Sequence, residues 1–217
     1  NIVADTQYVI KHAPRLQLGN APLIGFPGSD SDQIELMWQT QPSGNGSEDH
    51  FTVQHRVAGS AAPWTLTLAI NQIVIPSAGR VNHTAVIDDL SFDSEYDYRV
   101  RHLSGDVVVD EYGATFRTRL APNDPSVFSF VAYGDSADID DIDPFRNVQS
   151  RISAVDPAFA LLLGDNVYDS GTHSESDARF DAAINPEASA WNSGHIDYVG
   201  FGNHDVQTDG SEINYSA

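Results

Sequence analysis

Apolar and polar residues alternate over short stretches through residues 1–122, as expected for strands that bury one face. Clusters of Gly, Pro, Ser and Asn separate these stretches, which are 34–40, 50–57, 64–70, 83–90, 96–103 and 112–119. Short strands at this spacing predict a β-sandwich. Trp38 is expected between its sheets, and the turn before Tyr96 and Tyr98 has the sequence of a tyrosine corner.

The pattern changes after a linker at 120–126 that contains two prolines. In this part of the chain, three apolar runs predict buried strands. A stretch with helical spacing follows each of the first two. The strands are 127–135, 158–165 and 195–205, and the helices are 144–155, with apolar Phe145, Val148, Ile152 and Val155, and 174–184. Strands that alternate with helices predict a βαβαβ unit with a parallel sheet over residues 126–217.

Each of the three predicted parallel strands ends on a glycine followed by side chains that can bind metal. Asp135 follows the first strand, Asp165 follows the second, and Asn203 and His204 follow the third. One Gly-Asp pair is typical of an ordinary turn. Three such ends in one parallel sheet meet at the same edge, so the sequence predicts a metal site there with oxygen and nitrogen ligands.

Charge and composition narrow the chemistry of such a site. The 217 residues include 31 acidic and 11 basic side chains, which give a net charge of −20, and Lys11 is the single lysine. This surface repels nucleic acid, and it can hold a phosphate only where a local cation such as a metal ion is present. There is no cysteine, so metal ligands must be oxygen or imidazole.

The sequence contains no apolar run of the length that spans a bilayer, so no membrane partner is expected. Three Asn-x-Ser/Thr sequons occur, at Asn45, Asn82 and Asn214. They would matter only in a eukaryotic secretory pathway.

The stretches GD (134–135), GDNVY (164–168) and GNHD (202–205) resemble the signature of the calcineurin-like metallophosphoesterases. Tyr168, three residues after Asp165, matches the purple acid phosphatase branch of that superfamily. Members of this branch carry a fibronectin type III-like domain ahead of a four-layer catalytic domain, which is the order expected here for 1–122 and 126–217. Because the branch is mostly exported, the resemblance implies a secreted or periplasmic protein.

The resemblance also implies a role for each motif residue. Asp135 would bind a first metal, Asp165 would bridge two metals, and Tyr168 would bind the first as phenolate, which favours Fe(III). Asn203 would bind the second metal, which is Fe, Zn or Mn, and would contact substrate. His204 would face the substrate and stabilise the phosphoryl oxygens or protonate the leaving group. The implied reaction is hydrolysis of phosphomonoesters by a metal-bridging hydroxide, while a phosphodiesterase or nucleotidase remains open.

Two departures from the family pattern leave alternatives open. Ala137 stands where the family has Gly or a ligating His, and Asp138 is either a solvated loop acid or a group that supports a ligand. The family takes three further His ligands from the second half of its domain, whereas this sequence ends at Ala217. We therefore expect a nicked protein whose separate C-terminal fragment supplies the histidines, or a truncated chain. A non-catalytic binding or storage module is the alternative.

The remaining histidines are expected to be structural or solvated. Scattered His residues without a carboxylate partner are usually surface or strand-face residues, as we expect for His50, His55, His83 and His102. His173 is expected in an exposed loop, with a place in the substrate pocket as the alternative. His195 precedes the third strand at the end away from the site.

Overall fold

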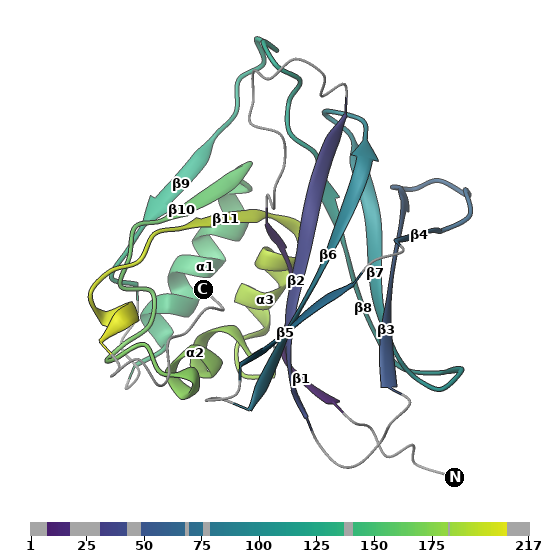
Figure 1. The fold of residues 1–217 in the computed structure, drawn as a ribbon. Helices are drawn as coiled ribbons and strands as arrows, with labels where there is room; N and C mark the ends of the chain where they lie inside the picture. Colours follow the sequence, from purple (N-terminus) through teal and green to yellow (C-terminus); the bar gives the residue numbers. More distant parts are fainter. Residues whose placement is uncertain are drawn as a thin grey trace.

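The computed structural model describes residues 8–17, 31–42, 49–67, 70–75, 79–136, 141–181 and 183–207. It is rich in strands, which form a seven-stranded sheet, β5-β6-β2-β1-β11-β10-β9, and a four-stranded sheet, β4-β3-β7-β8 (Figure 1). The strands of the first half are β1 (Tyr8–Gln17), β2 (Asp32–Pro42), β3 (Asp49–Val57), β4 (Thr65–Thr67), β5 (Asn71–Ile75), β6 (Arg80–Leu90), β7 (Glu95–Ser104) and β8 (Val107–Arg117). The second half contains β9 (Phe130–Tyr133), α1 (Asp143–Val155), β10 (Phe159–Leu162), α2 (His173–Phe180), α3 (Pro186–Gly194), β11 (Ile196–Val199) and the 3-10 turn η1 (His204–Val206).

The first half packs two sheets around one apolar core. Alternate residues of β2 point inward, and Trp38 lies in the core at 1% exposure, as the sequence predicted. The tyrosine corner is also present, because the backbone N–H of Ser91 donates to the Tyr96 hydroxyl at 3.0 Å. The sequence analysis missed β1, whose pairing with β2 shifts register around His12, and whose Pro14 interrupts any regular alternation.

In the second half, β9, β10 and β11 pair in parallel, as predicted. Helices α1, α2 and α3 gather below these strands in the view of Figure 1. The helix expected at 144–155 is confirmed as α1, which buries Phe145 and Ile152, although Val155 is exposed. The helix expected at 174–184 ends earlier, at Phe180. None of the helices that the structure describes is both long and apolar enough to cross a membrane.

The two halves share one sheet. Strands β1 and β11 pair in parallel, with Leu16 opposite Ile196, and both side chains belong to the core of the sandwich. The Tyr98 hydroxyl of β7 reaches across and donates to the carbonyl of Ser193 in α3 at 2.9 Å. The two halves are therefore joined by strand pairing and shared packing and are not independent bodies.

Among the described residues, one face of β9 is exposed, and the same face of β10 and β11 is only partly covered, with Phe130 52% and Tyr198 38% exposed. Phe130 lies opposite Phe159, their rings stack at 5.3 Å between centroids, and Tyr198 meets Phe159 edge-on at 5.2 Å. Phe128 also contacts Phe159, at 5.9 Å. We call Phe128, Phe130, Phe159 and Tyr198 the aromatic face.

The sequence analysis expected the first of these strands to be buried, and this is wrong for β9. Phe130 is 52% exposed, and the strand alternates between exposed and half-buried residues. The helices lie against the opposite side of the sheet, where the Tyr133 hydroxyl accepts a hydrogen bond from Gln149 of α1 at 3.0 Å. A strand of a parallel sheet that has helices on one side only keeps its other side open.

The hydroxyl of Tyr98 is expected to contribute to the contact between the halves. Tyr98→Phe removes the bond to Ser193 and leaves a carbonyl without this donor, so the free energy of unfolding should fall by about 1–2 kcal/mol. Urea unfolding measures the change. Tyr112→Phe is the matched control, because its hydroxyl bonds only the nearby exposed Asp110, and its effect should stay below about 0.5 kcal/mol. Equal effects of the two variants would contradict this assignment.

Candidate functional site

The carboxyl ends of β9, β10 and β11 lie level at one edge of the sheet. The backbone N–H of Leu163 donates to the Tyr133 carbonyl at 2.8 Å, and that of Gly200 donates to the Leu162 carbonyl at 2.7 Å. The N–H of Asp135 extends this ladder to the carbonyl of Gly164, at 3.3 Å. The three motifs therefore leave the sheet side by side.

Two glycines allow the motif loops to pack at backbone distance. A Cβ on Gly202 would lie 2.1 Å from Oδ1 of Asp165, so any side chain there would displace this carboxylate. A Cβ on Gly164 would lie 2.8 Å from the backbone nitrogen of Gly202, and Gly164 also has a φ of +106°. Asp135 follows Gly134 and Asp165 follows Gly164, and the backbone of both aspartates adopts the left-handed region, with φ of 48° and 51°. Asp tolerates this conformation better than most residues.

Four of the five predicted site residues are linked by a chain of contacts, from Asp135 through Tyr168 and His204 to Asp165. The Tyr168 hydroxyl donates to Oδ1 of Asp135 at 2.7 Å, and the rings of Tyr168 and His204 lie 4.4 Å apart between centroids. The backbone N–H of His204 donates to Oδ1 of Asp165 at 2.9 Å. Asn203 is exposed, and its place beside the others follows from its position directly before His204 at the start of η1.

The hydrogen bond of the His204 ring identifies its tautomer. Nδ1 lies 2.6 Å from the carbonyl oxygen of Asp169. Because a carbonyl oxygen only accepts, Nδ1 must carry the proton and donate it. Nε2 is therefore the ring nitrogen through which neutral His204 can accept a proton or imidazolium can give one.

The surroundings of Tyr168 favour its neutral form. Burial, the hydrogen bond to Asp135 and the negative charges of Asp165 and Asp135 all raise the pKa of the Tyr168 phenol, and Arg179 opposes them. In the absence of a stronger cation, Tyr168 is a hydrogen-bond donor. It could act as a phenolate ligand only toward an ion that displaces its proton.

Asp205 holds the loop that follows β10, a role that the sequence analysis did not assign. Its side chain is buried, and Oδ1 accepts from the backbone N–H groups of Asn166 at 2.7 Å and Val167 at 2.8 Å. Its Oδ2 accepts from the N–H of Gly202 at 2.8 Å and from Nδ2 of Asn166 at 3.0 Å. This carboxylate therefore joins the loop after β10 to the loop after β11. The sequence feature that could have pointed to Asp205 is its position as the last residue of the GNHD motif.

The histidines outside the site depart from the expectations at His173, which is buried, and at His102, which has a carboxylate partner. His173 is buried at the start of α2 rather than exposed in a loop, because Thr172 caps a helix that begins there. His195 is structural, as expected, and its ring stacks on Trp191 at 3.6 Å. In the sandwich, His83 is fully buried against Trp38, and buried His102 bonds Asp49 at 2.9 Å.

Several sequence features fall elsewhere. Ala137 and Asp138 lie outside the described residues, as do the sequons at Asn45 and Asn214. Asn82 is buried in β6 and accepts a hydrogen bond from Gln39 at 2.9 Å, so its side chain is not placed to carry a glycan.

The side chains at the site that could bind a metal ion do so through oxygen, and they are few. Within the part of the chain that the structure describes, no three His, Asp or Glu side chains lie close enough together to hold a metal ion. The donors gathered here are the carboxylates of Asp135 and Asp165 and the phenol of Tyr168, with the amide of Asn203 nearby in sequence. Carboxylate and phenolate oxygens suit hard, highly charged cations.

Among solved structures, the chain is similar to the purple acid phosphatase PPD1 from yellow lupin (Lupinus luteus) seeds, with a TM-score of 0.62 and 18% sequence identity. The match covers 90% of this chain and 36% of the phosphatase, so the chain spans about a third of that protein's length. At this identity the match shows a shared fold.

Two further matches carry no argument, because their TM-scores are 0.35. One is the vertebrate perforin-like membrane protein Astrotactin-2, at 14% identity over 58% of this chain and 23% of that chain. The other is the Bifidobacterium dentium beta-glucuronidase complexed with coumarin-3-O-glucuronide, at 12% identity over 90% of this chain and 31% of that chain. No family model matches the sequence, and no curated protein matches it.

Asp205→Asn is expected to loosen the loop between β10 and α2. The substituted amide presents N–H groups to backbone donors, so at least one bond among those to Asn166, Val167 and Gly202 is lost in a buried place. The free energy of unfolding should fall by about 3 kcal/mol, and the Val167 amide should exchange faster with solvent. Asp106→Asn, on the exposed turn between β7 and β8, is the control. A stability equal to that of the control would refute the role of Asp205.

Proposed function

We propose that this chain carries part of a binuclear metal-dependent hydrolase of phosphoric esters, most like a purple acid phosphatase, with phosphomonoesters as substrates. The observation that supports this most is the contact of Tyr168 with Asp135 and His204, and of His204 with Asp165, at the ends of three parallel strands. Ligands of α/β folds bind at such an edge. The likeness of fold to a purple acid phosphatase agrees with this reading.

The residues present fit part of a two-metal site. Asp135, Asp165 and Tyr168 would hold one ion, which we propose to be Fe(III), and Asp165 with Asn203 would hold part of the shell of a second, Fe, Zn or Mn. Tyr168 and Asp135 already place their oxygens 2.7 Å apart, as neighbouring ligands of one ion must. When bound, such ions would supply positive charge to a phosphate and lower the pKa of a water molecule.

The protein's own residues then have separate tasks. The bond from its backbone N–H fixes His204 against Asp165, and the bond from Nδ1 to Asp169 fixes the ring. In the imidazolium form of the ring, Nε2 can therefore donate to a phosphoryl oxygen or protonate a leaving alkoxide. Asn203 would contact the same phosphate. The surrounding charge of −20 would repel a phosphate at long range, so binding would depend on the local cations.

A site of this kind needs further ligands, and we propose that imidazoles of a second segment complete it. This segment would be a C-terminal fragment of a nicked chain, held by packing on the aromatic face. The aromatic face supports this proposal, because parallel sheets are normally covered on both sides. By the same resemblance we propose a secreted or periplasmic protein. From the net charge of −20 and the lack of a long apolar run in this sequence we propose that it has no nucleic-acid or membrane partner.

A second candidate is a non-catalytic binding or storage module with the same fold. It is favoured by the small number of metal-binding side chains brought together among the described residues. The two candidates differ in turnover: a binding module would hold phosphate or metal without hydrolysing an ester. A phosphodiesterase or nucleotidase would differ from the leading proposal only in the ester that it hydrolyses.

Substitution of the candidate ligands tests the proposal directly. Protein purified with any accompanying fragment should contain two metals by elemental analysis, show a visible absorption band, and hydrolyse para-nitrophenyl phosphate. Asp165→Asn should remove metal and lower hydrolysis by at least about 100-fold, because a bridging carboxylate is lost. Tyr168→Phe should abolish the visible band, because no phenolate remains to transfer charge to Fe(III).

Asp106→Asn is again the control and should keep metal, colour and activity. Metal content and hydrolysis that survive Asp165→Asn would contradict the assigned site. Phosphate binding without hydrolysis in the unsubstituted protein would favour the binding module.

A further inference from the structure

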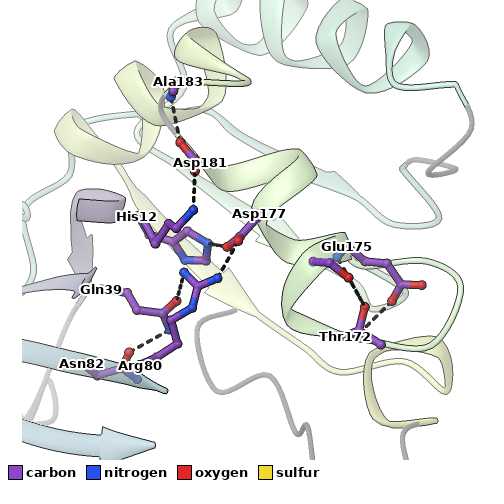
Figure 2. Close-up of polar contacts among 11 residues, drawn as sticks. His12, Gln39, Arg80, Asn82, Thr172, Glu175, Asp177, Asp181 and Ala183 are labelled. Atoms are coloured by element: carbon purple, nitrogen blue, oxygen red, sulfur yellow. Dashed lines mark hydrogen bonds and ion pairs between the residues drawn. The ribbon is translucent and has the colours of Figure 1, made fainter. Parts of the chain in front are cut away.

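Helix α2 is bonded both to the sandwich and to the loop that follows Tyr168. Figure 2 shows Asp177 on one side of the helix, facing Arg80, and Glu175 on the other, beside Thr172. The sandwich contributes His12 of β1 and Arg80 of β6, which converge on Asp177 in the middle of the helix. The opposite side of the helix carries Glu175, which faces the loop that follows Tyr168. Contacts with the sandwich on one side and with this loop on the other therefore both involve α2.

The contacts on the sandwich side are short and largely buried. Nη2 of Arg80 donates to Oδ2 of Asp177 at 2.6 Å, and Nε2 of His12 lies 3.2 Å from Oδ1 of the same carboxylate. The side chains of His12 and Arg80 are 4% and 8% exposed, and that of Asp177 is 15% exposed. Lys11 adds a longer ion pair to Asp181, just past the end of the helix, at 3.9 Å.

Other residues hold Arg80 in place before it meets the helix. Its Nη1 donates to Oε1 of Gln39 at 3.5 Å, and Nε2 of Gln39 donates to Oδ1 of Asn82 at 2.9 Å. Burial raises the pKa of Asp177, but the bonds from His12 and Arg80 outweigh burial and lower it overall. Asp177 is therefore ionised at neutral pH. A buried ion pair of this kind fixes one geometry, whatever its net contribution to stability.

On the site side, a single carboxylate gathers the loop after Tyr168. Oε1 of Glu175 accepts from the N–H of Asp169 at 2.7 Å, and Oε2 accepts from those of Thr172 at 2.7 Å and Ser170 at 3.2 Å. Thr172 accepts in return from the N–H of Glu175, which completes a capping box. The first turn of α2 thus determines the path of the chain directly after Tyr168.

Arg179, near the end of the helix, holds the chain before Tyr168. Its Nη1 donates to the carbonyl of Asn166, and its guanidinium lies 5.8 Å from the centre of the Tyr168 ring. The loop is therefore attached to α2 on both sides of Tyr168, and a displacement of α2 would move the phenol relative to Asp135.

We propose that Arg80 and Asp177 are positioning residues for the candidate site, through which the sandwich sets the place of α2 and hence of the loop that carries Tyr168. Neither residue touches the site itself. The structural part of this inference stands on the contacts alone, and its consequence for metal binding rests on the proposed function.

Amide hydrogen exchange tests the structural part. Arg80→Met removes the charged donor and keeps an apolar side chain of similar length, so exchange at Asp169, Ser170 and Thr172 should become about tenfold faster or more. Arg80→Lys, which keeps the charge, should restore part of the protection. Arg56→Met is the matched control, because this arginine pairs with Asp97 at 3.5 Å and covers Trp64 on the other sheet.

Amides of the sandwich core, such as that of Val53, report on global opening in the same experiment. If Arg80→Met accelerates them by the same factor as the loop, the contact is simply structural and the positioning role is overturned. Asp177→Asn, which keeps the size of the side chain, is measured in parallel as a milder variant, and the same outcome in it has the same meaning. Unchanged loop exchange in both variants would also overturn the inference.

Titration with Zn²⁺ tests the functional part with the same proteins. If both proposals hold, Arg80→Met should weaken Zn²⁺ binding by about tenfold, and Arg56→Met should not. If the loop loosens selectively but the unsubstituted protein binds no Zn²⁺, the positioning role stands and the proposed function fails. If Zn²⁺ binding is present and is equal in both variants, the site does not depend on the sandwich.

Discussion

A Cβ atom on Gly164 would meet the backbone of Gly202, and one on Gly202 would meet Asp165, so the candidate site depends on glycine at both positions. The two glycines let the loop after β10 pack on the loop after β11 and leave space for the Asp165 carboxylate. Asp205 then bonds both loops, and the N–H of His204 reaches Asp165. A side chain at either glycine would push the two loops apart or displace the Asp165 carboxylate.

Much of this arrangement could be predicted because it follows from local pattern and topology. Alternation identified most strands of the sandwich, and strand–helix alternation identified a parallel sheet. Parallel strands place their carboxyl ends at one edge whatever their detailed packing. That rule alone was enough to expect Asp135, Asp165 and His204 near one another. Tyr168 was added only through the resemblance to the purple acid phosphatase pattern, in which a tyrosine stands three residues after this aspartate.

What could not be predicted depends on contacts between residues distant in sequence. Strand β1 carries a proline and two register shifts, so its pattern does not alternate, yet it joins the two halves through its pairing with β11. The sequence around His173 is typical of a loop, but α2 begins at this residue after the Thr172 cap, and the side chain is buried. The pairing of Asp177 with Arg80 spans 97 residues, and no short-range pattern reports it.

The central claim is that this chain supplies part of a two-metal site which a second polypeptide segment completes. Native mass spectrometry of the purified protein, with resolution sufficient to count bound metals, tests it most directly. The account predicts an assembly heavier than the 23.6 kDa of this chain, with two metal ions. A species of 23.6 kDa without metal would contradict the account and leave this chain with the fold alone.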